Sequence, residues 1–152
     1  MLPKPILTMG NIRTEITIAA TLSDVWRVLS DTAAWPEWNP LVTSFDGISE
    51  EGRRVRIRLK VKALPAFRVP VRVSALKPGE RLSWTFTLPF GILRAEHSFS
   101  LSEGPDGSTR FLDTERFTGL LGGIAGTLMN RFFLDDYRGM DRAIAERVAS
   151  GR

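Results

Sequence analysis

Residues 21–45 read TLSDVWRVLSDTAAWPEWNPLVTSF, and three patterns follow one another in this stretch. The first is helical, because apolar residues recur at the spacing of one helix face, at Leu22, Val25, Trp26 and Leu29. Thr21 is a suitable N-cap, and Asp24 three residues later resembles a capping box with Asp in place of Glu. Together these signals predict a helix from about residue 22 to 31.

The second pattern is the group of tryptophans and prolines in AWPEWNP, residues 34–40. Pro36 and Pro40 limit this segment to one short helical turn between extended residues. Trp35 and Trp38 supply large apolar area at a low cost in side-chain entropy. Either ring can line a cavity or simply pack in the core, and the sequence leaves both interpretations open.

The third pattern begins at Leu41, where apolar and polar residues alternate as they do in half-buried strands. With one earlier run, this alternation predicts seven strands, at residues 12–18, 41–48, 53–62, 67–76, 81–88, 94–102 and 108–117. Short turn segments separate the later strands, as expected of an antiparallel sheet. Pro70 has no N–H to donate, so it predicts an edge strand or a bulge.

The chain closes with a long amphipathic helix, predicted at residues 122–149 after the glycine-rich entry GLLGGIAG. Its apolar stripe contains Leu128, Phe132 or Phe133, Tyr137, Met140, Ile144 and Val148. A strongly curved sheet that wraps around one helix need not fill all the space between them, so the α+β fold expected here can enclose a cavity. Gly139 costs about 1 kcal/mol relative to alanine, which predicts a packing need or a space beside it.

Length and composition set limits on the class of protein. With 152 residues, the chain is expected to form a flexible leader at residues 1–10 and one domain at residues 11–150. The sequence leaves open whether Met1 or Met9 is the true start. The absence of cysteine excludes disulfides and thiol chemistry, and a cytoplasmic location is compatible with it. No apolar run is long enough for stable membrane insertion.

The formal net charge of +4 raises nucleic acid as a partner, because basic residues gather in RRVRIRLKVK, residues 53–62. The period of this segment favours another explanation. Val55, Ile57, Leu59 and Val61 alternate with basic residues, as in a strand with one buried and one wet face. We therefore expect a solvated outer face and no nucleic-acid partner. The oligomeric state is not predicted.

Sequence motifs exclude several kinds of chemistry. There is no phosphate-binding glycine loop, no dinucleotide fingerprint and no nucleophile elbow. One histidine without cysteine makes a metal site unexpected, and no cofactor is expected. Asp135 and Asp136 are adjacent on a helix, so their side chains project in different directions and are poorly placed to form a paired-carboxylate site.

The candidate chemistry is at His97 and Glu115. Both share the inward phase of their strands, and a hairpin that turns about Asp106 places His97 opposite Glu115 and Phe99 opposite Asp113. We therefore expect an imidazole nitrogen to contact the Glu115 carboxylate, directly or through one water. This pair can be catalytic, or it can be a polar pair that orients the strands.

Longer segments resemble a known superfamily. They are ITIAATLSDVWRVLSDTAAWPEWNPLVTSFDG, ALKPGERLSW, AEHSFSL and TRFLDTERFTGLL, and the similarity runs from about Asn11 to Val148. These segments resemble the superfamily of START lipid-transfer domains, the birch-pollen allergen and bacterial polyketide cyclases/dehydrases, called SRPBCC. VWRVLSD, WPEWNP, EHSF and ERFTGLL resemble its bacterial polyketide cyclase/dehydrase branch in particular.

The resemblance implies a helix-grip fold, with two short helices after the first strand and a cavity that Trp35 and Trp38 help to close. It implies binding of a small hydrophobic molecule such as a lipid, polyketide or aromatic metabolite. The alternatives are a cyclase/dehydrase-type enzyme that uses His97, Glu115 and Tyr137 as acid or base, and a protein-interaction module with a closed cavity. The residues expected around a ligand pocket of at least about 300 Å³ are Trp35, Trp38, Leu59, Val71, Trp84, Phe86, Phe99, Asp113, Phe117, Phe133, Tyr137 and Met140.

Overall fold

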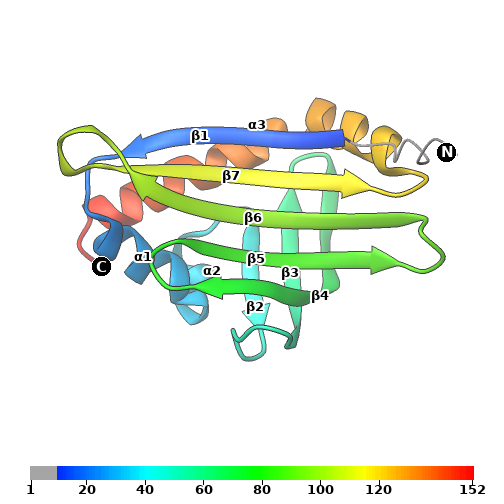
Figure 1. Cartoon of the computed structure of the whole chain (residues 1–152), viewed down its shortest axis with the longest axis horizontal. Coiled ribbons are helices and arrows are strands. Elements are labelled where there is room, and N and C mark those ends of the chain that lie inside the picture. The colour runs from blue at the N-terminus through cyan, green and yellow to red at the C-terminus, as the bar shows by residue number, and fades with distance from the viewer. Residues whose placement is uncertain (1–9) are drawn as a thin grey trace, which may run out of the picture.

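The structure is a computed structural model that describes residues 10–152, and its elements appear in the predicted order (Figure 1). They are β1 (Gly10–Ile18), α1 (Leu22–Ser30), η1 (Thr32–Ala34), α2 (Trp35–Trp38), β2 (Val42–Asp46), β3 (Arg54–Val61), β4 (Leu64–Lys77), β5 (Arg81–Leu88), β6 (Leu93–Glu103), η2 (Pro105–Gly107), β7 (Thr109–Thr118) and α3 (Gly122–Ala149). The leader predicted at residues 1–10 lies outside the described residues, except for Gly10, which is the first residue of β1.

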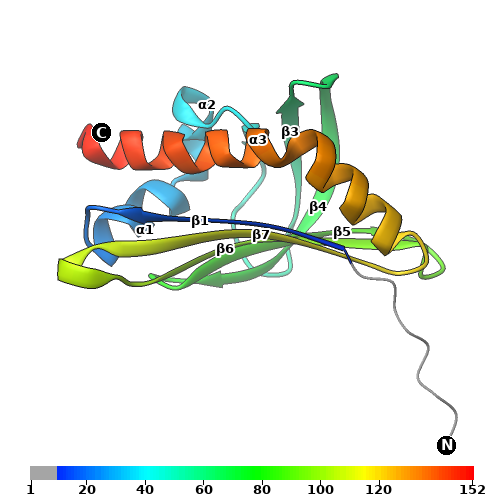
Figure 2. The same ribbon diagram turned by 90° about the horizontal axis from the view of Figure 1, so that it is seen from above.

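The seven strands form one sheet in the order β1-β7-β6-β5-β4-β3-β2, and every neighbouring pair is antiparallel. The 28-residue helix α3 lies against one face of this sheet, and β3 and β4 turn up beside it (Figure 2). The predicted α+β helix-grip fold is therefore confirmed, including the short helices after the first strand. The observed bounds of α3 are those that the sequence predicted, residues 122–149.

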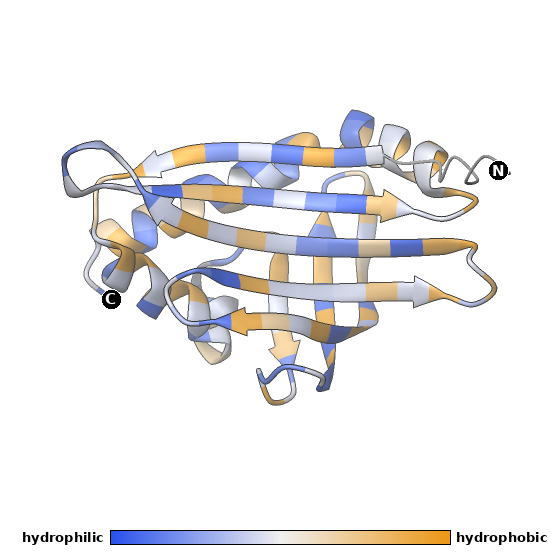
Figure 3. Cartoon of the chain, in the orientation of Figure 1, coloured by the Kyte–Doolittle hydropathy of each residue, from blue (hydrophilic) through white to orange (hydrophobic). Residues whose placement is uncertain are grey.

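The two-residue period of the strands separates a buried face from a wet one, and Figure 3 shows hydrophobic and hydrophilic residues alternating along β1 and β7. In β3, Val55 and Ile57 are buried, whereas Arg54, Arg56 and Arg58 are exposed. The basic residues of this strand thus lie on the outer face, as their phase predicted. Among residues 10–152, no helix has both the length and the apolar character required to span a bilayer.

Pro70 occupies an edge-like position within a central strand. Strand β4 pairs with β3 from Leu64 to Arg72, but its pairing with β5 begins only at Arg72. Pro70 therefore has a partner strand on one side only, as a residue of an edge strand does. Proline is tolerated at such positions because its missing N–H can face the unpaired side. The first half of β4 separates from β5 at this point, and the sheet is open there.

Helix α3 is held against the sheet at two positions, near its start and at its middle. Gly126 meets Gly10 of β1 so closely that a methyl group on Gly126 would overlap the Cα atom of Gly10. At the middle of the helix, the backbone N–H of Lys62 in the β3–β4 turn donates to Oδ1 of Asp136 at 3.2 Å. Both contacts fix the height of the helix above the inner face of the sheet.

Candidate functional site

Trp35 packs in the core at one end of the molecule. It is fully buried, and its indole Nε1–H donates to the carbonyl oxygen of Leu29 at 3.0 Å, which satisfies a carbonyl at the end of α1. Its ring meets Phe45, Trp84 and Phe99 with centroids 5.7 to 6.1 Å apart. The sequence left open whether this ring lines a cavity or packs in the core, and in the structure it packs in the core.

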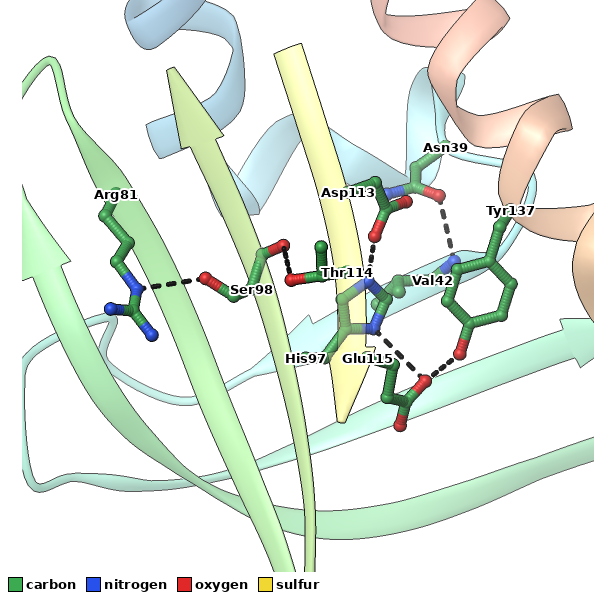
Figure 4. Close-up of polar contacts among 9 residues, drawn as sticks. All are labelled: Asn39, Val42, Arg81, His97, Ser98, Asp113, Thr114, Glu115 and Tyr137. Atoms are coloured by element: carbon green, nitrogen blue, oxygen red, sulfur yellow. Dashed lines mark hydrogen bonds and ion pairs between the residues drawn. The ribbon is translucent and has the colours of Figure 1, made fainter. Parts of the chain in front are cut away.

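Asn39 fixes the exit from α2, a role that sequence reasoning missed. Its buried side-chain Oδ1 accepts from the backbone N–H of Leu41 at 3.0 Å and from that of Val42 at 2.9 Å, the second of which is drawn in Figure 4. The turn into β2 is thereby anchored. An asparagine just before a proline is a common turn signal, so the sequence carried a hint of this role.

The predicted register of β6 and β7 is confirmed. His97 is opposite Glu115, Phe99 opposite Asp113 and Leu101 opposite Phe111. The side chains of His97, Asp113 and Glu115 all lie on the inner face of the sheet, below α3 (Figure 4).

The direct partner of the imidazole is Asp113, a contact that was not predicted from the sequence. His97 Nε2 lies 2.7 Å from Asp113 Oδ1, whereas Nδ1 lies 3.8 Å from Glu115 Oε2, beyond hydrogen-bonding distance. Both Asp113 and His97 are buried. The physical reason is diagonal reach: in an antiparallel pair a long or planar side chain can contact the residue two positions away from its opposite.

Helix α3 completes the cluster with Tyr137. Its hydroxyl donates to Glu115 Oε2, and its ring stacks on the imidazole with centroids 5.2 Å apart and planes 19° apart. His97, Asp113, Glu115 and Tyr137, together named the buried polar cluster, join β6, β7 and α3 (Figure 4).

Asp141 lies one turn beyond Tyr137, and sequence reasoning missed it. Its side chain is 1% exposed, and neither carboxyl oxygen has a hydrogen-bond partner among residues 10–152. The signal was available, because Asp141 lies within the apolar stripe of α3, between Met140 and Ile144. Burying a charged carboxylate on the inner face of a helix costs free energy, and protonation of the group removes that cost.

The electrostatics of the cluster favour bound protons. Burial raises the pKa of Glu115 to about 6, partly opposed by the imidazole of His97. Burial, with the charge of Asp113, raises the pKa of Asp141 to about 7. Burial opposes the charged form of His97, but the charge and hydrogen bond of Asp113 prevail and raise its pKa above the ordinary value. Groups with such pKa values can exchange protons near neutral pH. No three His, Asp or Glu side chains of residues 10–152 are arranged to ligate a metal ion.

The twelve residues expected around a ligand divide into two sets. Eight are buried and pack in the core or the polar cluster: Trp35, Val71, Trp84, Phe99, Asp113, Phe117, Tyr137 and Met140. Four are half-buried: Trp38, Leu59, Phe86 and Phe133. The buried set fills much of the space that the prediction assigned to a ligand. Val71 and Phe86 line an open hollow of about 280 Å³ where β4 separates from β5, and Trp38 lines a smaller one of about 50 Å³.

Burial changes along the inner face from one end to the other. Near α1 and α2, inward residues such as Trp84, Phe99 and Met140 are buried, and we name this the packed end. Toward the start of α3, inward-facing apolar residues are only half-buried, and we name this the open end: Leu59, Phe86, Leu93, Met129 and Phe133. On β7, Glu115 follows Asp113 toward the open end, and 14% of its side chain is exposed.

The family model for polyketide cyclase/dehydrase and lipid transport matches residues 9–149. No curated protein matches the chain in sequence.

Solved structures share the fold at low sequence identity. The di-domain aromatase/cyclase StfQ from the steffimycin biosynthetic pathway has a TM-score of 0.71 at 14% identity over 95% of this chain, which spans 52% of StfQ. The protein TTHA0849 from Thermus thermophilus has a TM-score of 0.69 at 20% identity over 93% of this chain and 99% of its own. A START superfamily protein from Mycobacterium smegmatis has a TM-score of 0.69 at 15% identity, over 93% and 99% of the two chains.

Proposed function

Because the chain belongs to the polyketide cyclase/dehydrase and lipid-transport family, we propose that it binds a small hydrophobic molecule at the open end, between the sheet and the first half of α3. One observation carries this proposal. Inward-facing apolar side chains on β3, β5, β6 and α3 keep part of their surface exposed there, whereas inward-facing side chains at the packed end, such as Trp84, Phe99 and Met140, are buried. Apolar surface on an inner face is what an apolar ligand can cover.

The buried polar cluster gives the site an orientation. Glu115 and Tyr137 lie on the inner face between the packed end and the apolar residues of the open end. A ligand with one polar group, such as a hydroxyl or carbonyl, can place that group at Glu115 and its apolar body toward Phe133. The proposed ligand class is therefore a lipid, polyketide or aromatic metabolite with a single polar end.

Ligand binding is tested by native mass spectrometry of the protein purified without denaturation, followed by thermal unfolding with fatty acids, sterols and flavonoids. A ligand that binds only the folded state raises the melting temperature as its concentration rises. The proposal fails if nothing co-purifies and no compound of the panel shifts the melting temperature.

Adjacent phenylalanines on α3 provide a matched pair of variants. Phe133 is half-buried against the core, whereas Phe132 is 53% exposed. We expect Phe133→Ala to weaken ligand binding by about tenfold, since it removes apolar contact area, and Phe132→Ala to leave it nearly unchanged. Equal loss in both variants would place the ligand elsewhere.

The polar cluster also favours a second candidate function, acid/base catalysis of the cyclase/dehydrase type. Glu115, with its pKa raised to about 6, is suited to remove a proton next to a carbonyl group. The Tyr137 hydroxyl donates to Glu115 in the structure, and once Glu115 carries the substrate proton this hydroxyl can turn to donate to the oxygen that gains charge. His97, held by Asp113, stacks behind Tyr137 and fixes its position.

Catalysis is separated from binding by following hydrogen–deuterium exchange at the acidic carbon of a bound 1,3-diketone by NMR. A catalytic Glu115 predicts that Glu115→Gln still folds and binds but loses at least about a hundredfold in exchange rate. A wild-type protein that binds the diketone without accelerating its exchange would leave binding as the function.

A further inference from the structure

Large apolar side chains are exposed at the open end of the molecule. Phe90, at the tip of the β5–β6 turn, is 96% exposed, and five other residues are 43% to 74% exposed. We name the six together the apolar tip: Phe90, Leu120, Leu121, Ile124, Leu128 and Phe132. Soluble proteins seldom expose this much apolar surface in one region without a binding role.

Backbone contacts join the segments of the apolar tip. The N–H of Leu120 donates to the carbonyl of Gly91 at 3.0 Å, and the N–H of Leu121 donates to the carbonyl of Ile92 at 2.9 Å. The β5–β6 turn and the β7–α3 loop are therefore neighbours. Ile124, Leu128 and Phe132 follow at four-residue spacing, so they continue along one face of α3. Figure 2 shows this part of α3 tilted toward the β5–β6 end of the sheet.

Basic residues flank the apolar tip on its own segments. Residues 86–95 and 116–134 contain no Asp or Glu and three arginines, Arg94, Arg116 and Arg131, although Glu96, just beyond, pairs with Arg94 at 3.6 Å. The guanidinium of Arg131 lies over the ring of Phe132, 5.6 Å from its centroid. A basic rim around an exposed apolar centre is complementary to a surface that is anionic outside and apolar beneath.

We propose that the apolar tip docks on the surface of an anionic lipid bilayer, with Phe90 and the first turns of α3 entering the headgroup region and the basic rim facing lipid phosphates. This proposal concerns a partner of the outer surface and does not depend on the ligand proposed above. The docking is peripheral, since Leu120 to Phe132 can bury only one helix face and one loop in the interface.

The backbone at Phe90 supports a role for its side chain. Its φ of 60° lies in the left-handed region, which a bulky residue adopts at a cost. Glycine or asparagine fits that conformation better, so the phenylalanine does not serve the turn. It presents an aromatic ring to solvent at the tip of a hairpin.

Vesicle flotation tests the proposal with the whole chain. Vesicles of phosphatidylcholine with about 30% phosphatidylglycerol, at about 0.1 M salt, are compared with pure phosphatidylcholine vesicles. Phe90→Asn keeps the turn favourable and is expected to lower the partition coefficient by about tenfold. The matched control is Ile48→Asn, because Ile48 is 58% exposed in the β2–β3 connection, away from the apolar tip, and should keep wild-type partitioning.

The charge of the rim is tested with two arginines on the outer face of β7. Arg116 lies toward the apolar tip, and Arg110 lies at the opposite end of the same strand; both are exposed. Arg116→Gln should lower partitioning into anionic vesicles by about fivefold, whereas Arg110→Gln should change it little. Phe133→Ala, which is designed to weaken ligand binding, should leave vesicle binding unchanged.

Four results would overturn the proposal. They are no flotation of the wild type with anionic vesicles, equal flotation with neutral ones, wild-type flotation of Phe90→Asn, and equal loss in Arg110→Gln and Arg116→Gln. A dimer in sedimentation velocity that Phe90→Asn converts to a monomer would assign the apolar tip to a second copy of the chain instead. Loss of ligand binding with retained flotation, or the reverse, separates this proposal from the proposed function.

Discussion

The packed end and the open end are built from the same strands and the same helix, yet they differ in what fills them. At the packed end, α2 inserts Trp35 into the core, where Trp84 and Phe99 pack against it and Phe111 stacks on Phe99. An ion pair of 2.6 Å between Glu37 of α2 and Arg147 ties this helix to the end of α3. At the open end, no helix of residues 10–152 other than α3 itself lies against the sheet.

The part of α3 at the open end is rich in small residues. Gly122, Ala125 and Gly126 form the first turns of α3, and Gly126 meets Gly10 of β1 directly. The helix therefore closes on the sheet edge at β1, while half-buried side chains remain toward β4 and β5. One sheet can thus supply stability at one end and partly exposed apolar surface at the other.

The largest contrast is expected between Trp35→Ala and Phe132→Ala. Removing Trp35 leaves a cavity among Phe45, Trp84 and Phe99 and an unpaired Leu29 carbonyl, and should lower the free energy of unfolding by about 3–5 kcal/mol. Phe132→Ala removes an exposed ring and should cost less than about 1 kcal/mol. Urea denaturation measures both, and similar losses would mean that stability is not concentrated at the packed end.

Stability should fall as pH rises, because the buried polar cluster holds protons more tightly in the folded state. The pKa of Asp141 is raised from 3.8 to about 7, and that of Glu115 from 4.5 to about 6. Each contribution is complete below the unfolded pKa and is lost as pH rises through the folded one. His97, with its raised pKa, acts in the same direction. We expect the free energy of unfolding to fall by about 5 kcal/mol between pH 4 and 7.5.

Variants of two aspartates of α3 distinguish the titration of buried groups from a general effect of charge on the pH dependence of stability. Asp141→Asn removes the buried titration and should flatten the profile between pH 4 and 7. Asp135, whose side chain is 76% exposed, is the matched control, and Asp135→Asn should keep the wild-type profile. Denaturation at several pH values is the measurement. A profile that rises with pH in the wild type would contradict the electrostatics described for the cluster.

The smallest effects, of opposite sign, are expected at two glycines of α3. A methyl group on Gly126 would overlap the backbone of Gly10, so Gly126→Ala should cost about 1–3 kcal/mol. A methyl group on Gly139 meets only the Arg142 guanidinium, at 3.9 Å, so Gly139→Ala should gain about 0.5–1 kcal/mol. Thermal unfolding compares them. Equal losses would mean that glycine is needed at both positions and that the close approach of α3 to β1 is not special.

Much of the fold was predictable because local patterns and the fold agree. The alternation in β5 predicted its bounds at residues 81–88, and the apolar stripe predicted α3 at residues 122–149. The register of His97 with Glu115 followed from a symmetric hairpin, because antiparallel pairing needs only the position of the turn. Gly139 was expected to answer a packing need or a space, and the space is what the structure shows.

The sequence by itself determined which residues face inward, since strand and helix periods are local properties of the chain. The tertiary structure alone decided that His97 bonds to Asp113, that Tyr137 reaches Glu115, and that Asp141 is buried beside them. It also decided that most of the expected ligand residues pack against one another. The physical reason is that these outcomes depend on the height and tilt of α3 above the sheet. Those are set by long-range contacts such as Gly10 with Gly126, which no local pattern encodes.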